Sequence, residues 1–189
     1  MSNPIKNTFS ICRDLTVNRM GYGAMRITGK GIWGPPADKA EAIRVLKRTI
    51  ELGINFIDTA DSYGPYISEE LIAEALHPYP ADLVIATKGG LERTGPDQWP
   101  VNAHPDHLKT ALEGSLKRLK VERIDLYQLH RIDPKVSAED SFAFLKKAQE
   151  EGKINHIGLS EVTVADIKHA QEFFDVATVQ NMYSVDNRK

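Results

Sequence analysis

The sequence of 189 residues contains one cysteine, Cys12, which excludes an internal disulfide and a zinc site built from cysteines. This scarcity favours a reducing, cytoplasmic setting. No stretch approaches the roughly 18 apolar residues of a membrane-spanning helix, and residues 1–15 lack the apolar core of a secretory signal peptide. We therefore expect a cytoplasmic protein with no membrane partner.

An excess of either charge is also lacking. Lys and Arg number 24, Asp and Glu number 26, and the formal net charge is −2, so nothing in the balance favours a nucleic-acid partner. Hydrophobic residues make up 41% and charged residues 26% of the chain, values that exclude general disorder. No linker or low-complexity tract divides the sequence, and residues 1–189 are expected to form a single domain.

Apolar runs typical of β-strands alternate with longer helical patterns. The predicted strands are 20–25, 54–58, 83–87, 124–130, 154–160 and 176–180. Several are continuously apolar, as expected of strands buried on both faces. Helices are predicted over 38–52 and 69–76, the second opened by Ser68, and others begin at Pro105, Ser137 and Thr163. This alternation indicates a parallel sheet built from βαβ units.

Polar side chains follow several successive strands, and their distribution decides between two parallel folds. They are Asp58, Lys88, His130, Ser160 and Gln180. A doubly wound open sheet concentrates its site at one switch point, whereas a (β/α)8 barrel brings all its strand ends to one face. The barrel fits better. Only about six βα units can be counted, so we expect an incomplete barrel that lacks strands seven and eight.

Three of these side chains, Asp58, Lys88 and His130, form a chemically meaningful set with Tyr63, which lies five residues after Asp58. Tyrosine is normally a poor acid at neutral pH, and a nearby ammonium such as Lys88 would lower the pKa of Tyr63. A carboxylate, Asp58, would hold that ammonium charged and fixed. His130 at the same mouth could orient a carbonyl oxygen. The set is suited to giving a proton to an oxygen that becomes an alkoxide, as when hydride reaches a carbonyl carbon.

The chain closely resembles the aldo-keto reductase family, and its bacterial members in particular. The resemblance lies in segments 21–25, 55–64, 86–88, 124–130, 156–160 and 179–181. It implies a (β/α)8 barrel that reduces aldehyde or ketone substrates, with NADPH, or less often NADH, as hydride donor. Pyridoxal-like aldehydes are among the substrates that the resemblance admits.

The resemblance also implies a role for each site residue. Tyr63 matches the general acid, Asp58 and Lys88 match the residues that tune it, and His130 matches the residue that orients the carbonyl. For the cofactor, Ser160 and Gln180 match residues that hydrogen-bond the nicotinamide carboxamide, and Asp58 is also assigned to the cofactor site. Glu161 departs from the asparagine of many members, and a carboxylate cannot donate as an amide does. The phosphate contacts that the family carries on strands seven and eight cannot be mapped.

Other residues have simpler interpretations. Asp61 is expected to be a solvated turn residue or a helix cap. His104 and His107 flank a helix start and are expected in an exposed first turn, so no metal site is predicted. Trp33 could line the substrate pocket or only cover the barrel. His156 is expected to be packed.

A second hypothesis belongs to another functional class. Because the phosphate-binding region cannot be mapped, the chain could be a catalytically silent or truncated barrel that acts as a binding or interaction protein. An arc of six strands would also leave two sheet edges with unpaired backbone groups. We therefore expect a marginally stable chain that self-associates through these edges or stays an open arc.

Overall fold

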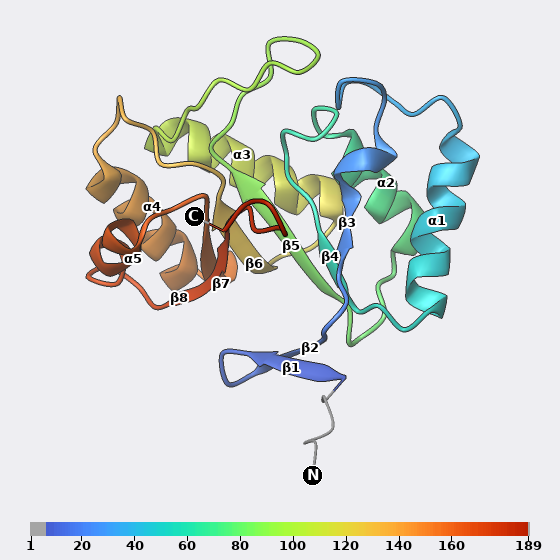
Figure 1. Cartoon of the computed structure of the whole chain (residues 1–189), viewed down its shortest axis with the longest axis horizontal. Helices are drawn as coiled ribbons and strands as arrows, with labels where there is room; N and C mark the ends of the chain where they lie inside the picture. The colour runs from blue at the N-terminus through green and yellow to red at the C-terminus, as the bar shows by residue number, and fades with distance from the viewer. Residues whose placement is uncertain (1–6, 189) are drawn as a thin grey trace.

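The computed structural model describes residues 7–188 of the chain. Its main sheet has six parallel strands, and each strand pairs with the next in sequence. The strands are β3 (Tyr22–Gly23), β4 (Phe56–Asp58), β5 (Val84–Gly89), β6 (Ile124–Leu129), β7 (Ile154–Ser160) and β8 (Val176–Gln180). The sheet curls into an arc whose two outer strands, β3 and β8, do not meet (Figure 1). The prediction of an incomplete barrel is confirmed.

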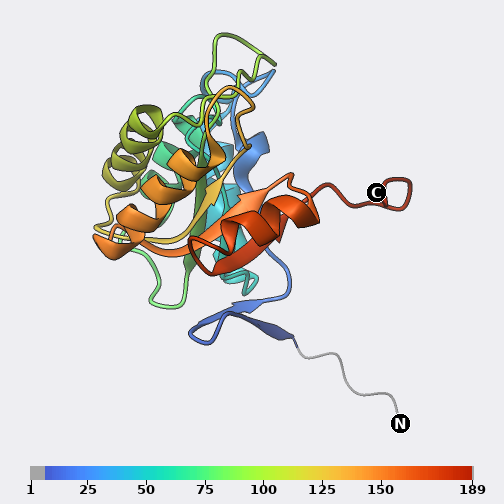
Figure 2. The ribbon, with the colours of Figure 1, turned by 90° about the vertical axis from the view of Figure 1, so that its left-hand side faces the viewer.

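Five helices alternate with these strands and lie around the outside of the arc (Figures 1 and 2). They are α1 (Lys39–Glu51), α2 (Ile67–Leu76), α3 (Pro105–Leu119), α4 (Ala138–Glu150) and α5 (Val164–Ala170). Their apolar faces and the sheet form one core, in which Leu46, Ile57, Leu108, Phe142 and Leu145 are completely buried. Within the described residues, no helix is long and apolar enough to cross a bilayer.

Two predicted helix starts differ in detail from the structure. Helix α2 begins at Ile67, so Ser68 lies inside its first turn and does not open it. The Ser68 hydroxyl donates to the Ala24 carbonyl at 3.0 Å and lies 2.7 Å from the Thr59 hydroxyl, so tertiary contacts replace the cap. At α4, the Ser137 hydroxyl bonds Glu139 and caps no backbone N–H. The predicted start at Thr163 is confirmed as a reciprocal capping box with Asp166.

The first predicted strand is shorter than expected, and a hairpin precedes it. Residues 20–25 contribute only β3, after which Ala24–Ile27 form a 3₁₀-helix, η1, that the Thr28 hydroxyl closes by donating to the Met25 carbonyl. The hairpin consists of β1 (Thr8–Ile11) and β2 (Leu15–Asn18). The sequence analysis did not predict this hairpin because the turn residue, Cys12, takes a positive φ of 56°. Turns with a positive φ are usually recognised by Gly, Asn or Asp at that position.

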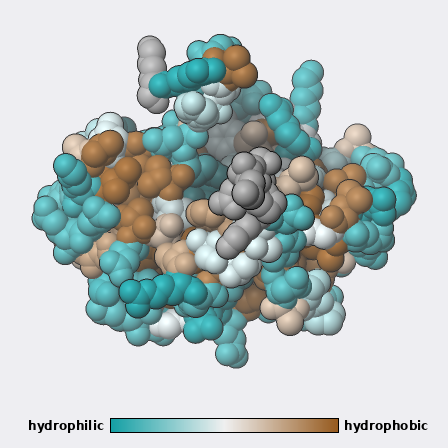
Figure 3. Space-filling model, turned by 60° about the horizontal axis from the view of Figure 1, so that its bottom comes forward, coloured by the Kyte–Doolittle hydropathy of each residue, from teal (hydrophilic) through white to brown (hydrophobic). Residues whose placement is uncertain are grey.

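The hairpin covers the amino ends of the barrel strands. Ile11, Leu15 and Val17 alternate on its inner face and pack with Val84 of β5. His156 of β7 is partly buried and reaches Asp14 in the hairpin turn, with 3.1 Å between Nε2 and the carboxylate. Figure 3, which brings this end of the molecule forward, shows hydrophobic side chains in separate patches among polar ones. The catalytic end of a barrel lies at the opposite, carboxyl ends of its strands.

Candidate active site

The carboxyl ends of five neighbouring strands bring the predicted site residues to one edge of the sheet. Asp58 ends β4, Lys88 is the penultimate residue of β5, and His130 directly follows β6. Ser160 and Gln180 end β7 and β8 and are paired partners in the strand register. The in-register parallel pairing therefore places side chains that are far apart in sequence around one mouth.

An ion pair between Lys88 and Asp58 forms the base of the site. The Lys88 ammonium lies 2.8 and 2.7 Å from the two Asp58 carboxylate oxygens and donates to the Thr59 carbonyl at 2.9 Å. Its side chain is almost completely buried, and this burial lowers the pKa of Lys88, while Asp58 opposes the shift. The third polar contact is the Tyr63 hydroxyl, 3.4 Å from the ammonium nitrogen.

Gln128 is a member of this cluster that the sequence analysis missed. It lies beside Lys88 in the register of β5 and β6, and its side-chain amide donates to Asp58 at 3.2 Å. The sequence contains a signal for this placement. Residues two apart along a strand share a face, and Gln128 precedes the predicted site residue His130 by two. The carboxylate of Asp58 is thus held from two neighbouring strands.

The environment of Tyr63 differs from the expectation. Burial raises the pKa of the Tyr63 phenol, and Asp58 and Asp61 raise it further, whereas Arg131 opposes them. The Lys88 ammonium, whose charge Asp58 balances at hydrogen-bond distance, does not outweigh burial and the two carboxylates. The predicted lowering of the Tyr63 pKa is therefore absent here. A phenol with a high pKa keeps its proton at neutral pH, which is the form that a general acid requires.

His130 completes the polar wall next to Tyr63. Their rings meet edge to face with centroids 5.8 Å apart, and the Ser62 hydroxyl lies 3.5 Å from His130 Nδ1. Burial lowers the pKa of His130 well below its ordinary value of 6.5, and Lys88 and Arg131 add to the shift. The imidazole is therefore neutral at physiological pH and can offer one N–H to a ligand oxygen.

This burial predicts a pH dependence of stability. In the unfolded chain His130 gains a proton below pH about 6.5, but the folded protein resists that protonation, so the free energy of unfolding falls as the pH is lowered from about 6.5. The contribution is at most about 1.4 kcal/mol per pH unit. Urea unfolding of wild type and His130→Gln at several pH values isolates it. A difference between the two proteins that is constant from pH 7 to 5 would contradict the assignment.

A cavity of about 380 Å³ opens beside Tyr63 and His130. Its other lining residues are Met25, Leu91, Trp99, Val101 and Arg131. The walls are mainly apolar, and the polar atoms converge at one end, which is the usual arrangement of a small-molecule site. None of these five additional residues was predicted, because they come from the loops that follow β3, β5 and β6.

Arg93 fixes the loops around this cavity. Its guanidinium donates five hydrogen bonds to backbone carbonyls, among them those of Ile32 and Ser62 at 2.7 and 2.8 Å. It also stacks on Trp99 at 3.6 Å from the ring centroid. Trp33 lies on the same guanidinium, 5.5 Å away, and is 37% exposed, outside the residues that line the cavity. A role for Trp33 in the substrate pocket stays a prediction.

Asp61 is not the solvated turn residue that was expected. It is 3% exposed, its Oδ1 has no hydrogen-bond partner among the described residues, and burial together with Glu69 raises its pKa well above the ordinary range. The turn is buried because Arg93 and the residues around Ile32 cover it: the Gly64 N–H donates to the Ile32 carbonyl at 3.2 Å. Sequence alone does not show which loops fold over a turn.

The buried carboxyl makes a second stability prediction. A raised pKa means that Asp61 favours folding only at low pH and opposes it as the pH rises above the unfolded value near 4. Asp61→Asn should therefore increase the free energy of unfolding at pH 7 by about 1–3 kcal/mol. Denaturation at pH 7 and pH 4 measures this gain, which should shrink toward pH 4. An equal gain at both pH values would argue against a raised pKa.

Ser160 and Gln180 present a hydroxyl and an amide side by side. Ser160 is buried and lies 3.2 Å from Arg131 Nη1, whereas Gln180 is exposed at the end of β8. These groups both donate and accept, so they fit a carboxamide. Glu161 takes a positive φ of 53°, and its carboxylate accepts the Met182 N–H at 2.7 Å, so one of its oxygens is already engaged by the chain.

Other ionisable clusters are less promising. His104 is exposed at the start of α3, as expected, but His107 is half-buried and lies 3.6 Å from Glu92. Within residues 7–188, no group of three or more His, Cys, Asp or Glu side chains could hold a metal ion.

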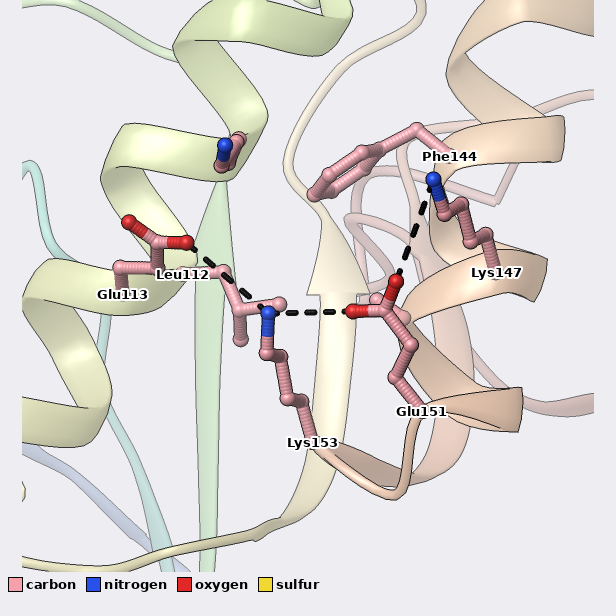
Figure 4. Close-up of a pocket in the computed structure, with 8 residues that line it drawn as sticks. Leu112, Glu113, Phe144, Lys147, Glu151 and Lys153 are labelled. Carbon is pink, nitrogen blue, oxygen red and sulfur yellow. Dashed lines mark ion pairs between the residues drawn. The ribbon is translucent and has the colours of Figure 1, made fainter.

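A groove of about 230 Å³ between α3 and α4 lies far from the strand carboxyl ends, beside the amino end of β7 (Figure 4). Its charged rim is internally paired, with Lys153 bridging Glu113 and Glu151. These ion pairs engage most of its charged side chains and leave Lys109 as the one lining residue of the described chain with a charge outside an ion pair.

Comparison with known proteins is consistent with this geometry. A model described as the aldo/keto reductase family matches residues 19–189. The chain is 57% identical over 176 residues to an uncharacterized oxidoreductase of Schizosaccharomyces pombe, covering 93% of this chain and 57% of that protein. It is 38% identical over 188 residues to pyridoxine 4-dehydrogenase of Escherichia coli, covering 96% and 65% respectively.

A solved structure, the glycerol dehydrogenase of Gluconobacter oxydans, superposes with a TM-score of 0.84 at 34% identity over 93% of this chain and 54% of that one. The chain thus spans between 54% and 65% of the length of these three proteins. The family match includes all of β3–β8 and every predicted site residue. By this match and by its fold, the chain belongs to the aldo/keto reductase family.

Proposed function

We propose that the chain carries the active site of an NADPH-dependent reductase that converts aldehydes or ketones into alcohols, with Tyr63 as the general acid. The observation that carries this proposal is the buried Lys88 ammonium, which contacts both Asp58 and the hydroxyl of Tyr63, a residue that lines the cavity. Membership of the aldo/keto reductase family supports oxidoreductase chemistry on carbonyl compounds.

Each residue has a defined part in this scheme. The neutral His130 imidazole donates to the substrate carbonyl oxygen and orients it toward Tyr63. The Tyr63 phenol gives its proton to that oxygen as negative charge develops there. The Lys88 ammonium, 3.4 Å from the phenol oxygen, stabilises the phenolate that remains. Asp58, held in turn by Gln128, keeps the ammonium in place.

The cofactor site is proposed from the groups at the ends of β4, β7 and β8. Ser160 and Gln180 would hold the nicotinamide carboxamide, and Asp58 would border the ring. When bound, the reduced nicotinamide supplies the hydride for the carbonyl carbon. We propose NADPH as the donor, with NADH as the alternative.

Pyridoxal-like aldehydes are the proposed substrate class. The similarity to pyridoxine 4-dehydrogenase supports this choice, as does a cavity of about 380 Å³ with apolar walls and convergent polar groups. The single, exposed cysteine is compatible with the cytoplasm as the place of action.

Titration of the chain with NADPH, followed by cofactor fluorescence, tests the proposal. We expect micromolar affinity and loss of NADPH absorbance when pyridoxal is added. Binding without turnover of any aldehyde would support the alternative of a catalytically silent binding protein. No detectable binding of NADPH or NADH would contradict the proposed function.

A further inference from the structure

We propose that Arg131 forms a subsite for an anionic group on the carbonyl substrate, a carboxylate or a phosphate; this inference rests on the proposed function. Arg131 follows His130 directly at the end of β6, and both residues line the cavity that contains Tyr63. The guanidinium therefore borders the same cavity as the groups that would hold the carbonyl oxygen.

The charge of Arg131 is not balanced by the protein. Among residues 7–188, no carboxylate lies within ion-pair distance of its guanidinium. The nearest candidates are engaged elsewhere: Asp58 pairs with Lys88, and Asp133 accepts the backbone N–H groups of Ala103 and Lys135. Because His130 is neutral, the cavity keeps one positive charge without a partner.

The guanidinium also has donors to spare. Its contacts in the described part of the chain use only Nη1, which donates to the His130 carbonyl at 2.6 Å and to the Ser160 hydroxyl at 3.2 Å. An arginine has five N–H donors arranged as a planar fork that matches carboxylate and phosphate oxygens. The Nε and Nη2 groups are thus available for a bidentate contact with an anion.

The other lining residues of the cavity define the body of the ligand. Met25, Leu91 and Val101 are apolar, and Trp99 adds a flat ring that is held by Arg93 on one side and by the edge of Tyr63 at 6.3 Å. A planar compound could place its carbonyl at Tyr63, its anionic substituent at Arg131 and its flat body against Trp99 and the apolar side chains. We infer an aryl aldehyde that carries one negative group.

The contact between Arg131 and Ser160 suggests a competing explanation, namely that Arg131 serves the cofactor. A carboxamide is neutral and would leave the arginine charge unbalanced, which favours the substrate. The two explanations predict different kinetics. A substrate subsite affects anionic substrates alone, whereas a cofactor contact affects every substrate equally.

Steady-state kinetics with 4-carboxybenzaldehyde and benzaldehyde tests the subsite. We expect wild type to prefer the carboxylate compound, and Arg131→Gln to lower kcat/KM for it by about 10- to 100-fold, mainly through KM. For benzaldehyde the change should stay within about threefold, and Arg131→Lys should partly restore the preference. Arg26→Gln, which removes an exposed arginine next to Met25, is the matched control and should leave both values unchanged.

Tryptophan fluorescence gives a readout that needs no turnover. Trp33 and Trp99 are the two tryptophans of the chain; both contact Arg93, and Trp99 also lines the cavity. We expect 4-(hydroxymethyl)benzoate to change the emission at lower concentration than benzyl alcohol, and Arg131→Gln to remove this difference. Charge-selective binding without reduction of either aldehyde would leave the subsite standing and refute the proposed reductase. Equal loss for both aldehydes in Arg131→Gln, or no charge selectivity in either assay, would overturn the subsite.

Discussion

Tyr63→Phe should lower kcat for aldehyde reduction by about 100- to 10,000-fold, the usual contribution of a general acid. The substitution removes only the hydroxyl, and the ring keeps its packing against Ile32, Ala60 and Trp99. Lys88 keeps its contacts with Asp58 and Thr59 and loses only its longest one, at 3.4 Å. Stopped-flow measurement of NADPH oxidation checks the result, and NADPH affinity should not change.

The matched control for this variant is Tyr79→Phe. The Tyr79 hydroxyl donates to the Leu119 carbonyl at 2.7 Å and lies outside the cavity. Its loss should cost about 1 kcal/mol of stability and leave the rate unchanged. Full activity of Tyr63→Phe in a folded protein would mean that another group gives the proton.

The largest stability effect is expected from Arg118→Met. Glu69 of α2 is completely buried, and its only cationic partner among the described residues is Arg118 of α3, whose Nε lies 2.6 Å from the carboxylate. The other carboxylate oxygen accepts from the Thr87 hydroxyl at 2.6 Å. Removal of the arginine leaves a buried charge without a partner, which costs about 3–5 kcal/mol. Urea denaturation measures the change.

Arg44→Met provides the comparison for this prediction. Arg44 also pairs with a glutamate on a helix, Glu41, but both side chains are more than half exposed to solvent. Such a pair contributes about 0.5 kcal/mol or less. Similar effects of the two substitutions would show that burial does not set the strength of the Glu69–Arg118 interaction.

The fold could be predicted from sequence wherever the signal is local. The predicted strands 154–160 and 176–180 coincide with β7 and β8 residue for residue, because short apolar runs between helical patterns are a local signal of strands. The start of α5 was predicted because its capping box lies within four residues. By contrast, Glu69 looks like an acidic first-turn residue, and its burial depends on Thr87 and Arg118, which lie 18 and 49 positions away.

The candidate site likewise has a part that could be predicted from local sequence signals and a part that could not. Asp58, Lys88 and His130 were predicted to meet because strand ends converge in a parallel sheet, and the structure brings them together. Their catalytic roles stay predictions. Arg93, Trp99 and Arg131 were missed because loops carry no periodicity. The buried state of Asp61 was missed for a related reason, since it follows from the way a distant loop folds over it.

The strictly sequential strand order has a consequence for how the chain folds during synthesis. Each strand from β4 to β8 pairs with the strand made just before it, so every βα unit can add to the preceding ones as it leaves the ribosome. The hairpin is the exception. Its apolar face packs with Val84 and also touches Ala177, which is synthesised some 160 residues later than Val17. The hairpin, although made before these strands, should therefore be among the last elements to reach its final place.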